Sequence, residues 1–152
     1  VVHEYIMPVV VNTDGVHTFC YWAVDCEGNV EAKKCLPEFR IDLTGPTVTI
    51  TGPATGYLYL FGNQLFALKS GKTIFLFNGI PVTATATSTD AAIATVQFFL
   101  DDVLMTEDTT APYAARHSTK HSGPATIKVT AIDILGHSAS DTLNIDNYLK
   151  LF

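Results

Sequence analysis

The chain has 152 residues, of which 47% are hydrophobic and only 16% are charged, so it can build a buried core and lacks the composition of a disordered chain. A net charge of −6 without any basic stripe excludes a nucleic-acid-binding role. The most apolar stretch, residues 57–77, is interrupted by glycine, asparagine, glutamine and lysine, which excludes a membrane-spanning helix there. Abundant Thr, Val and Ile beside scarce Glu, Lys and Arg favour an extracellular or cell-surface protein.

Three short strands are predicted in the first part of the chain, at residues 5–11, 16–24 and about 32–41. Alternation along the second strand places Phe19 and Tyr21 on one face and Trp22 on the other. Three strands with one apolar face cannot bury that face alone. We therefore interpret residues 1–45 as a partial domain that leads directly into a second one.

All three cysteines, Cys20, Cys26 and Cys35, lie in this partial domain, at spacings that match no zinc site. If residues 25–29 form a hairpin turn, Cys20 and Cys35 are equidistant from its centre and face each other across the two strands. The alternatives are a disulfide between Cys20 and Cys35 with Cys26 free, or three reduced and partly buried thiols. A register shift at Pro37 would give Cys35 a different partner.

The second part of the chain is dominated by strand patterns separated by Gly-Pro, Asn-Gly and similar turn residues. The predicted strands are residues 47–51, 81–87, 95–100, 103–106 and 126–133, and a last strand that carries Leu143 and Ile145. Short strands in this number predict an all-β, antiparallel β-sandwich over residues 46–147.

Two further apolar segments have more than one interpretation. Residues 57–61 and 74–77 are either part of the core or an exposed contact patch, which makes Tyr57 and Tyr59 candidate interface residues. Residues 148–152 are interpreted as a tail that either donates a strand to a neighbouring copy or leads toward a following domain. The interface candidates in that tail are Tyr148, Leu149, Leu151 and Phe152.

The chain also repeats itself at an offset of 108 residues. Residues 15–29 align without a gap on residues 123–137, and the identical positions are Gly15 and Gly123, Thr18 and Thr126, Ala23 and Ala131, Asp25 and Asp133, and Gly28 and Gly136. A period near this length is that of a whole small β-domain. Because little sequence precedes Gly15, we expect the chain to begin in the middle of a domain.

The segment D-G-V-H-T-F-C-Y-W-A-V-D-C-E-G-N-V-E, residues 14–31, is followed by F-R-I-D-L-T-G-P-T-V-T-I, residues 39–50. Together they resemble the end of an immunoglobulin-like (Ig-like) repeat running into the next repeat, as in large secreted and surface proteins of bacteria and archaea. Residues 57–59, 72–74, 96–102, 109–113 and 131–133 resemble a related archaeal type. The resemblance implies Ig-like sandwiches and a structural or adhesive role outside the cell, and it transfers no catalytic residue. The chain departs from the pattern in its cysteines, in Asp102 and in His137.

Few residues have the spacing of a catalytic or metal site. His17 and Cys20 are three apart on a strand, so their side chains point to opposite faces and make a poor base and nucleophile. His117 and His121 are interpreted as solvated loop residues rather than a metal pair, because Gly123-Pro124 opposes a helix there.

Four acidic residues crowd one predicted hairpin: Asp101, Asp102, Glu107 and Asp108. They either bind calcium, as carboxylates between extracellular β-domains do, or hydrogen-bond their own turns. No other cofactor is expected.

These observations predict a non-catalytic extracellular module that self-associates or stacks in tandem with neighbouring Ig-like domains. In its sharpest form it is a filament subunit joined by strand complementation. The alternative is a carbohydrate- or surface-binding module of a secreted protein. Trp22 is accordingly either an interface residue covered by another domain or chain, or part of a sugar-stacking platform.

Overall fold

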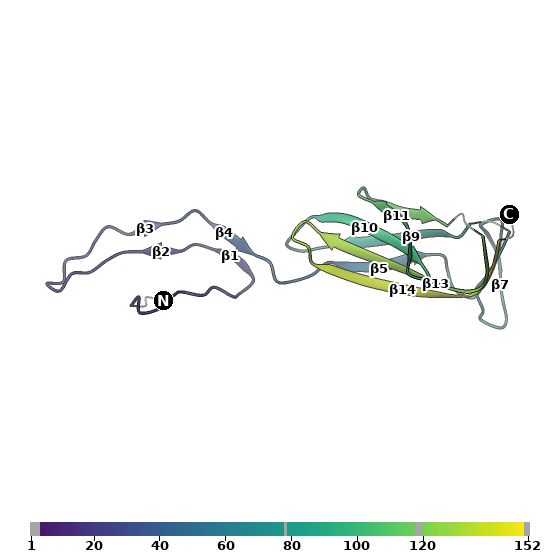
Figure 1. Ribbon diagram of the computed structural model, residues 1–152, viewed down its shortest axis with the longest axis horizontal. Helices are drawn as coiled ribbons and strands as arrows, with labels where there is room; N and C mark the ends of the chain where they lie inside the picture. Colours follow the sequence, from purple (N-terminus) through teal and green to yellow (C-terminus); the bar gives the residue numbers. More distant parts are fainter. Residues whose placement is uncertain (1–3, 78, 118–119, 151–152) are drawn as a thin grey trace. The chain divides into compact units, whose positions relative to one another are not determined.

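The computed structural model describes residues 4–77, 79–117 and 120–150, and in these ranges the regular structure is β-strand. The chain divides into two compact units, residues 1–44 (unit 1) and 45–152 (unit 2) (Figure 1). The division lies beside the boundary expected after residue 45. Within the described ranges, no helix is long and apolar enough to cross a membrane.

Unit 1 is one long hairpin with two short ladders (Figure 1). β1 (Gly15–His17) pairs with β4 (Phe39–Ile41), and β2 (Cys20–Tyr21) pairs with β3 (Lys34–Cys35), in both cases antiparallel. The strand predicted at residues 5–11 is wrong, because this segment is exposed and pairs with no described strand. Pro8 lacks a backbone N–H, which weakens any ladder in that segment.

Unit 2 is a sandwich of two β-sheets. The larger sheet has the order β11-β10-β13-β14-β8-β6-β7 and the smaller one β12-β9-β5. The strands in chain order are β5 (Thr47–Gly52), β6 (Tyr57–Leu60), β7 (Asn63–Ala67), β8 (Ile74–Leu76), β9 (Pro81–Thr87), β10 (Ile93–Leu100), β11 (Val103–Asp108), β12 (Tyr113–Arg116), β13 (His121–Asp133) and β14 (Ser138–Lys150). The ladders are antiparallel except at β8, which runs parallel to both β14 and β6.

The core of unit 2 lies between these sheets. Every second residue of the central strands points into it, because side chains alternate between the two faces of a strand. The fully or nearly fully buried residues include Val82, Ala84, Val96, Phe98, Leu100, Ala125, Ile127, Val129, Ala131 and Ile145. The backbone N–H of Ile50 donates to Asp141 Oδ2 at 2.8 Å, which ties the smaller sheet to β14.

The aromatic segments that the sequence left ambiguous each place one buried ring in this core, Tyr59 and Phe75, whereas Phe61 is 55% exposed. Tyr59 stacks on Phe75 with ring centroids 4.2 Å apart, and Phe75 meets Tyr148 edge-on at 6.5 Å. Tyr59 and Tyr148 are buried, and Tyr57 is partly buried against the same cluster. The prediction that Tyr59 and Tyr148 are interface residues is therefore wrong.

The prediction of a tail at residues 148–152 is also wrong for the first residues of that segment. β14 continues to Lys150, and Tyr148 and Leu149 pair in parallel with Phe75 and Leu76 of β8. The end of β14 thus has β8 as its pairing partner, and a local pattern in the sequence cannot predict a partner so far away in the chain. Leu151 and Phe152 lie outside the described residues.

We expect the buried ring of Phe98 to be one of the largest single contributions to the stability of unit 2. Phe98→Ala should lower the free energy of unfolding by about 3–5 kcal/mol, because it removes the ring and leaves a cavity. Urea unfolding followed by circular dichroism measures this loss. Phe99→Ala is the matched control, since Phe99 is only partly buried, with Lys128 Nζ 5.0 Å from its ring centroid. Equal losses in the two variants would contradict the placement of the core.

Candidate functional site

The turn of unit 1 is held by the carboxylate of Asp25. Its Oδ1 accepts the backbone N–H of Glu27 at 3.0 Å and of Asn29 at 2.8 Å, and its Oδ2 accepts the side-chain amide of Asn29 at 2.8 Å. These bonds, that of the Asn29 side chain first, hold the pKa of Asp25 below its ordinary value. Gly28 supplies the positive φ of 86° that the turn requires.

Unit 2 contains the same turn 108 residues later. Asp133 Oδ1 accepts the backbone N–H of Leu135 and of His137, each at 2.9 Å, and Gly136 has a φ of 91°. The backbone N–H of Asp133 donates to the His137 carbonyl at 3.0 Å, and Asp25 makes the same bond to Asn29 at the same distance. The sequence repeat is therefore a repeat of one structural element, a β-hairpin closed by an aspartate.

In unit 2 this hairpin is the centre of the larger sheet. β13 pairs with β10 on one side and β14 pairs with β8 on the other. One face of β13 is covered by the core, through Ala125, Ile127, Val129 and Ala131. Other parts of unit 2 thus cover the edge of β13 from Ile127 to Asp133, the end of β14 at Asn147–Leu149, and one face of the hairpin.

The hairpin of unit 1 lacks these surroundings. Among the described residues, no further strand pairs with the outer edge of β1 and β2 or of β3 and β4. At the offset of 108 residues, the four buried positions of β13 correspond to His17, Phe19, Tyr21 and Ala23. Tyr21 is 48% exposed, and Phe39, which pairs with His17, is 37% exposed.

Four aromatic side chains form a row on this side of the hairpin. His17 and Phe39 have ring centroids 5.8 Å apart, and Phe19 and Tyr21 have ring centroids 6.4 Å apart. We call His17, Phe19, Tyr21 and Phe39 the aromatic face. It is an apolar surface at the positions that a complete sandwich covers.

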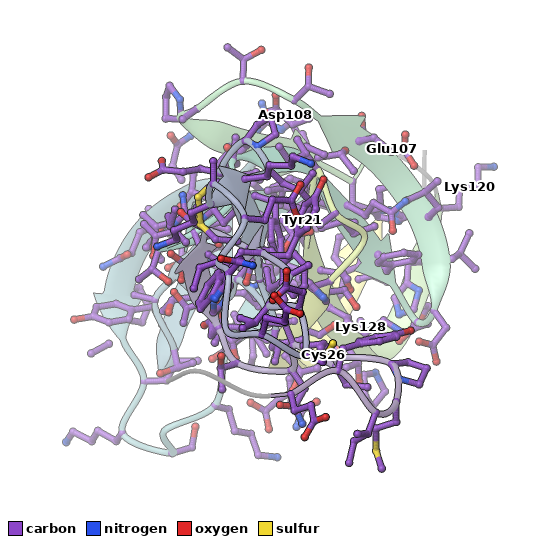
Figure 2. The ribbon with its side chains drawn as sticks, turned by 90° about the vertical axis from the view of Figure 1, so that its left-hand side faces the viewer. Tyr21, Cys26, Glu107, Asp108, Lys120 and Lys128 are labelled. Carbon is purple, nitrogen blue, oxygen red and sulfur yellow. A yellow bond between two sulfur atoms is a disulfide. The ribbon has the colours of Figure 1, made fainter. Side chains whose placement is uncertain are left out.

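The opposite face of the hairpin carries the disulfide. Cys20 and Cys35 pair directly across β2 and β3 and are joined through their sulfur atoms, so the structure brings together the two residues expected to pair (Figure 2). Cys26 is free and exposed. Trp22 is partly buried on this face, with Lys33 Nζ 5.9 Å from its ring centroid. Because Cys20 is oxidised, it cannot serve as the nucleophile weighed beside His17.

The four acidic candidates for calcium binding do not share a site. Asp101 accepts the backbone N–H of Thr126, Asp102 pairs with Lys128, Glu107 accepts the amide of Gln97, and Asp108 accepts two backbone N–H groups. Glu107 and Asp108 follow each other along β11 (Figure 2). No three of the four bring their ligand oxygens within 4.8 Å of one another. Each carboxylate thus serves a local hydrogen bond.

The interpretation of His117 and His121 as solvated loop residues is wrong for both. His117 is 8% exposed, and His121 begins β13 with a side chain that is 20% exposed. The His117 ring meets Tyr148 edge-on at 5.5 Å, and the His121 ring stacks on Tyr148 at 5.2 Å. No local sequence pattern could have predicted these two contacts, because Tyr148 lies at least 27 positions after either histidine.

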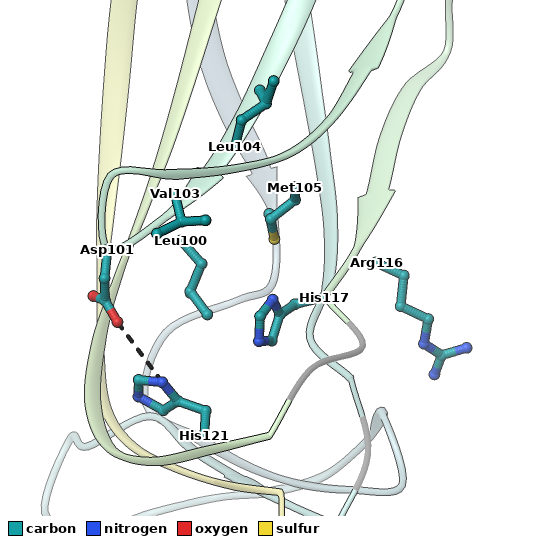
Figure 3. Close-up of a pocket in the computed structure, with 8 residues that line it drawn as sticks. All are labelled: Leu100, Asp101, Val103, Leu104, Met105, Arg116, His117 and His121. Carbon is teal, nitrogen blue, oxygen red and sulfur yellow. Dashed lines mark ion pairs between the residues drawn. The ribbon is translucent and has the colours of Figure 1, made fainter.

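These two histidines also line a pocket of about 270 Å³ that the sequence did not predict (Figure 3). Its apolar wall is formed by Leu100, Val103, Leu104 and Met105, and its polar side chains are Asp101, Arg116, His117 and His121. Asp101 faces His121 with 3.7 Å between the carboxylate oxygen and Nδ1.

The bacterial Ig domain family matches residues 46–131, more than half of the chain, which cover β5 to most of β13. The chain belongs to this family. Among solved structures, the fibronectin(III)-like modules of Clostridium thermocellum CbhA are similar, with a TM-score of 0.51 and 22% identity, over 70% of this chain and 100% of that chain. At this identity the likeness concerns the fold alone. No curated protein matches the chain.

Membership accounts for the architecture of unit 2. Bacterial Ig domains are β-sandwiches with the general role of structural or binding modules, and they occur in extracellular or surface proteins of bacteria. The aspartate hairpin spans β13 and β14, so it extends past the matched residues. Its copy in unit 1 lies wholly outside the match and is identified by its own turn geometry.

The carboxylate of Asp133 should make unit 2 sensitive to acid. Burial pushes the pKa of Asp133 upward, but the N–H donors of His137 and Leu135 and the His137 ring outweigh burial and hold the pKa below its ordinary value. A depressed pKa in the folded state stabilises the fold above the unfolded pKa of about 3.9, and this stability disappears as pH falls through the folded pKa.

Asp133→Asn should therefore melt at a lower temperature than the unchanged chain at neutral pH, and the gap should close as the solution is acidified. Thermal unfolding followed by circular dichroism at a series of pH values measures it. Asp102→Asn is the control, because the Asp102 side chain is 82% exposed. A constant gap between Asp133→Asn and the unchanged chain at every pH would show that the carboxylate charge does not hold the turn.

Proposed function

We propose that this chain is a non-catalytic extracellular structural module in which unit 2 is a complete Ig-like domain and unit 1 is a joining element. Unit 1 associates with β-structure from copies of this chain or from neighbouring Ig-like domains. The observation that carries this proposal is the aspartate hairpin of unit 1, which has the turn of β13 and β14 and none of their neighbours among the described residues.

The hairpin of unit 1 lacks the burial that a stable β-structure needs. A two-stranded hairpin is at best marginally stable in water, and it becomes stable when further strands or a second sheet cover its apolar face. The aromatic face and two open backbone edges are the surfaces that strand addition satisfies, because main-chain hydrogen bonds extend the sheet while side chains fill the uncovered face. Covering these surfaces stabilises unit 1 and joins it to whatever supplies the strands.

If the covering strands belong to a second copy, the joining surface of one copy meets a different surface of the next. Contacts of this head-to-tail type repeat without closing unless the geometry returns on itself, and they then build a filament. If the strands belong to a neighbouring Ig-like domain, the same contact stacks domains in tandem. Both forms assign the chain a mechanical role and no catalytic residue.

The carbohydrate-binding alternative has less support. A sugar platform needs an open aromatic ring, and Trp22 is partly buried with the Lys33 ammonium group over it. Tyr59 and Tyr148 lie in the core of unit 2, so their rings cannot contribute to such a platform.

Light scattering coupled to gel filtration, with negative-stain electron microscopy of the same samples, tests the proposal. The chain should form oligomers whose mass rises with concentration. The double variant Phe19→Ser/Tyr21→Ser, which makes the aromatic face polar, should be monomeric.

The matched control is Val16→Ser/Val24→Ser, which changes two exposed residues on the opposite face of the same strand segment and should still associate. Intact circular dichroism of unit 2 in all three proteins excludes a loss of folding as the cause. A chain that is monomeric at every concentration, or a control that dissociates as fully as the aromatic variant, would contradict self-association through this face.

A further inference from the structure

In unit 2, the first strand of the aspartate hairpin, β13, has β10 as its neighbour in the sheet. β10 runs antiparallel to β13, with Leu100 opposite Ile127, Phe98 opposite Val129 and Val96 opposite Ala131. All six side chains are buried in the core. The neighbour of the first arm is thus a strand with an apolar residue at every second position.

The backbone of unit 1 leaves the corresponding edge open. Phe19 and Ala23 direct their carbonyls into the hairpin, where they accept the N–H groups of Leu36 at 2.9 Å and Glu31 at 2.8 Å. In an antiparallel pair the residues between such positions direct their N–H and C=O groups the other way. The Cα atoms of Cys20 and Cys35 are 4.0 Å apart, the close spacing of a pair that exchanges no backbone hydrogen bonds. Cys20 and Trp22 therefore present their backbone groups to the outer edge.

The same edge is occupied in unit 2. Thr126, the counterpart of Thr18, donates its N–H to Asp101 Oδ1 at 2.8 Å and accepts the Asp101 N–H at 2.9 Å. Lys128 and Thr130, the counterparts of Cys20 and Trp22, pair with Phe99 and Gln97 of β10. The row Thr18, Cys20 and Trp22 is thus the edge along which β10 lies in the complete domain.

We propose that the outer edge of residues 16–24 accepts one antiparallel β-strand of an Ig-like domain, with apolar residues at alternate positions, in the register that β10 adopts on β13. This inference rests on the proposed function and specifies the partner of the same surface. The strand runs from the turn toward Gly15. Its three inward side chains lie beside Ala23, Tyr21 and Phe19, in that order, and it extends the apolar surface of the aromatic face.

The other face of the hairpin sets the side on which the partner's apolar residues lie. In unit 2 that face carries Thr126, Lys128 and Thr130, which are not buried. In unit 1 it carries the disulfide and Trp22 with Lys33 over its ring. A partner strand with its apolar residues on this side would leave the aromatic face uncovered.

Nuclear magnetic resonance of the ¹⁵N-labelled full chain tests the proposal, with a peptide of the β10 sequence, Ile-Ala-Thr-Val-Gln-Phe-Phe-Leu, flanked by lysines for solubility. A control peptide exchanges the neighbours Thr95 with Val96 and Gln97 with Phe98, so that its polar residues fall on the inward side. The β10 peptide should shift the amide signals of Thr18, Cys20 and Trp22 and slow their hydrogen exchange. The control peptide should bind more weakly and leave these amides exchanging as before.

A nitroxide at the amino terminus of the β10 peptide reports its direction. Because Ile93 pairs with Asp133, the counterpart of Asp25, the label should broaden signals at the turn rather than at Gly15. Broadening at Gly15, no response of the three amides at saturating peptide, or equal responses to both peptides would overturn the proposal.

The outcome separates this inference from the function on which it rests. A chain that binds the β10 peptide along residues 16–24 but never forms oligomers keeps the inference and removes self-association. Oligomers in which Thr18, Cys20 and Trp22 still exchange rapidly would assign association to another surface and overturn the inference.

Discussion

The hydrogen bonds from backbone N–H groups to one aspartate carboxylate organise each unit of this chain. In unit 2, Asp133 fixes the turn between β13 and β14, and this turn sets the register of the longest ladder in the domain. β10 then pairs along the edge of β13, β8 pairs with Asn147–Leu149 at the end of β14, and the smaller sheet covers the apolar face of the hairpin. The hairpin thus aligns the two halves of the larger sheet around one core.

Unit 1 contains the same element under different energetic conditions. Its turn is closed by Asp25, but its apolar side chains have no core among the described residues, so it lacks the burial that stabilises unit 2. The disulfide offsets part of this deficit. Closing a loop with a sequence separation of 15 between Cys20 and Cys35 stabilises the hairpin by about 3 kcal/mol in the chain-entropy account. Such a clasp keeps the two arms paired and leaves the aromatic face and outer edges available, which is what a joining element needs.

Much of this could be predicted from the sequence, because the decisive signals are local. Alternating apolar residues located β9, β10 and β13, and the repeated Asp and Gly residues located both turns. The position of Cys20 and Cys35 relative to the turn identified them as facing each other. Each of these inferences depends on residues a few positions apart, where strand periodicity and turn chemistry determine the geometry.

The remaining features depend on partners far away in the chain. The parallel ladder of β8 with β14 joins residues more than 70 positions apart, so residues 148–150 looked like a free tail and Tyr148 like a surface residue. The burial of His117 follows from the ring of Tyr148 in the same way. Aromatic segments such as residues 57–61 have the same composition in a core as on a contact surface, and only their partners distinguish the two.

Both hairpins are one structural element, and within the part of the chain that the structure describes only the first is uncovered. Residue-resolved hydrogen exchange of the monomeric chain, without any added partner, tests this claim most directly. The amides of Thr126, Lys128 and Thr130 should exchange slowly because β10 lies along them, whereas those of Thr18, Cys20 and Trp22 should exchange at rates close to those of an unfolded chain. Equal protection of the two sets in the monomer would mean that unit 1 is already complete and would contradict this account.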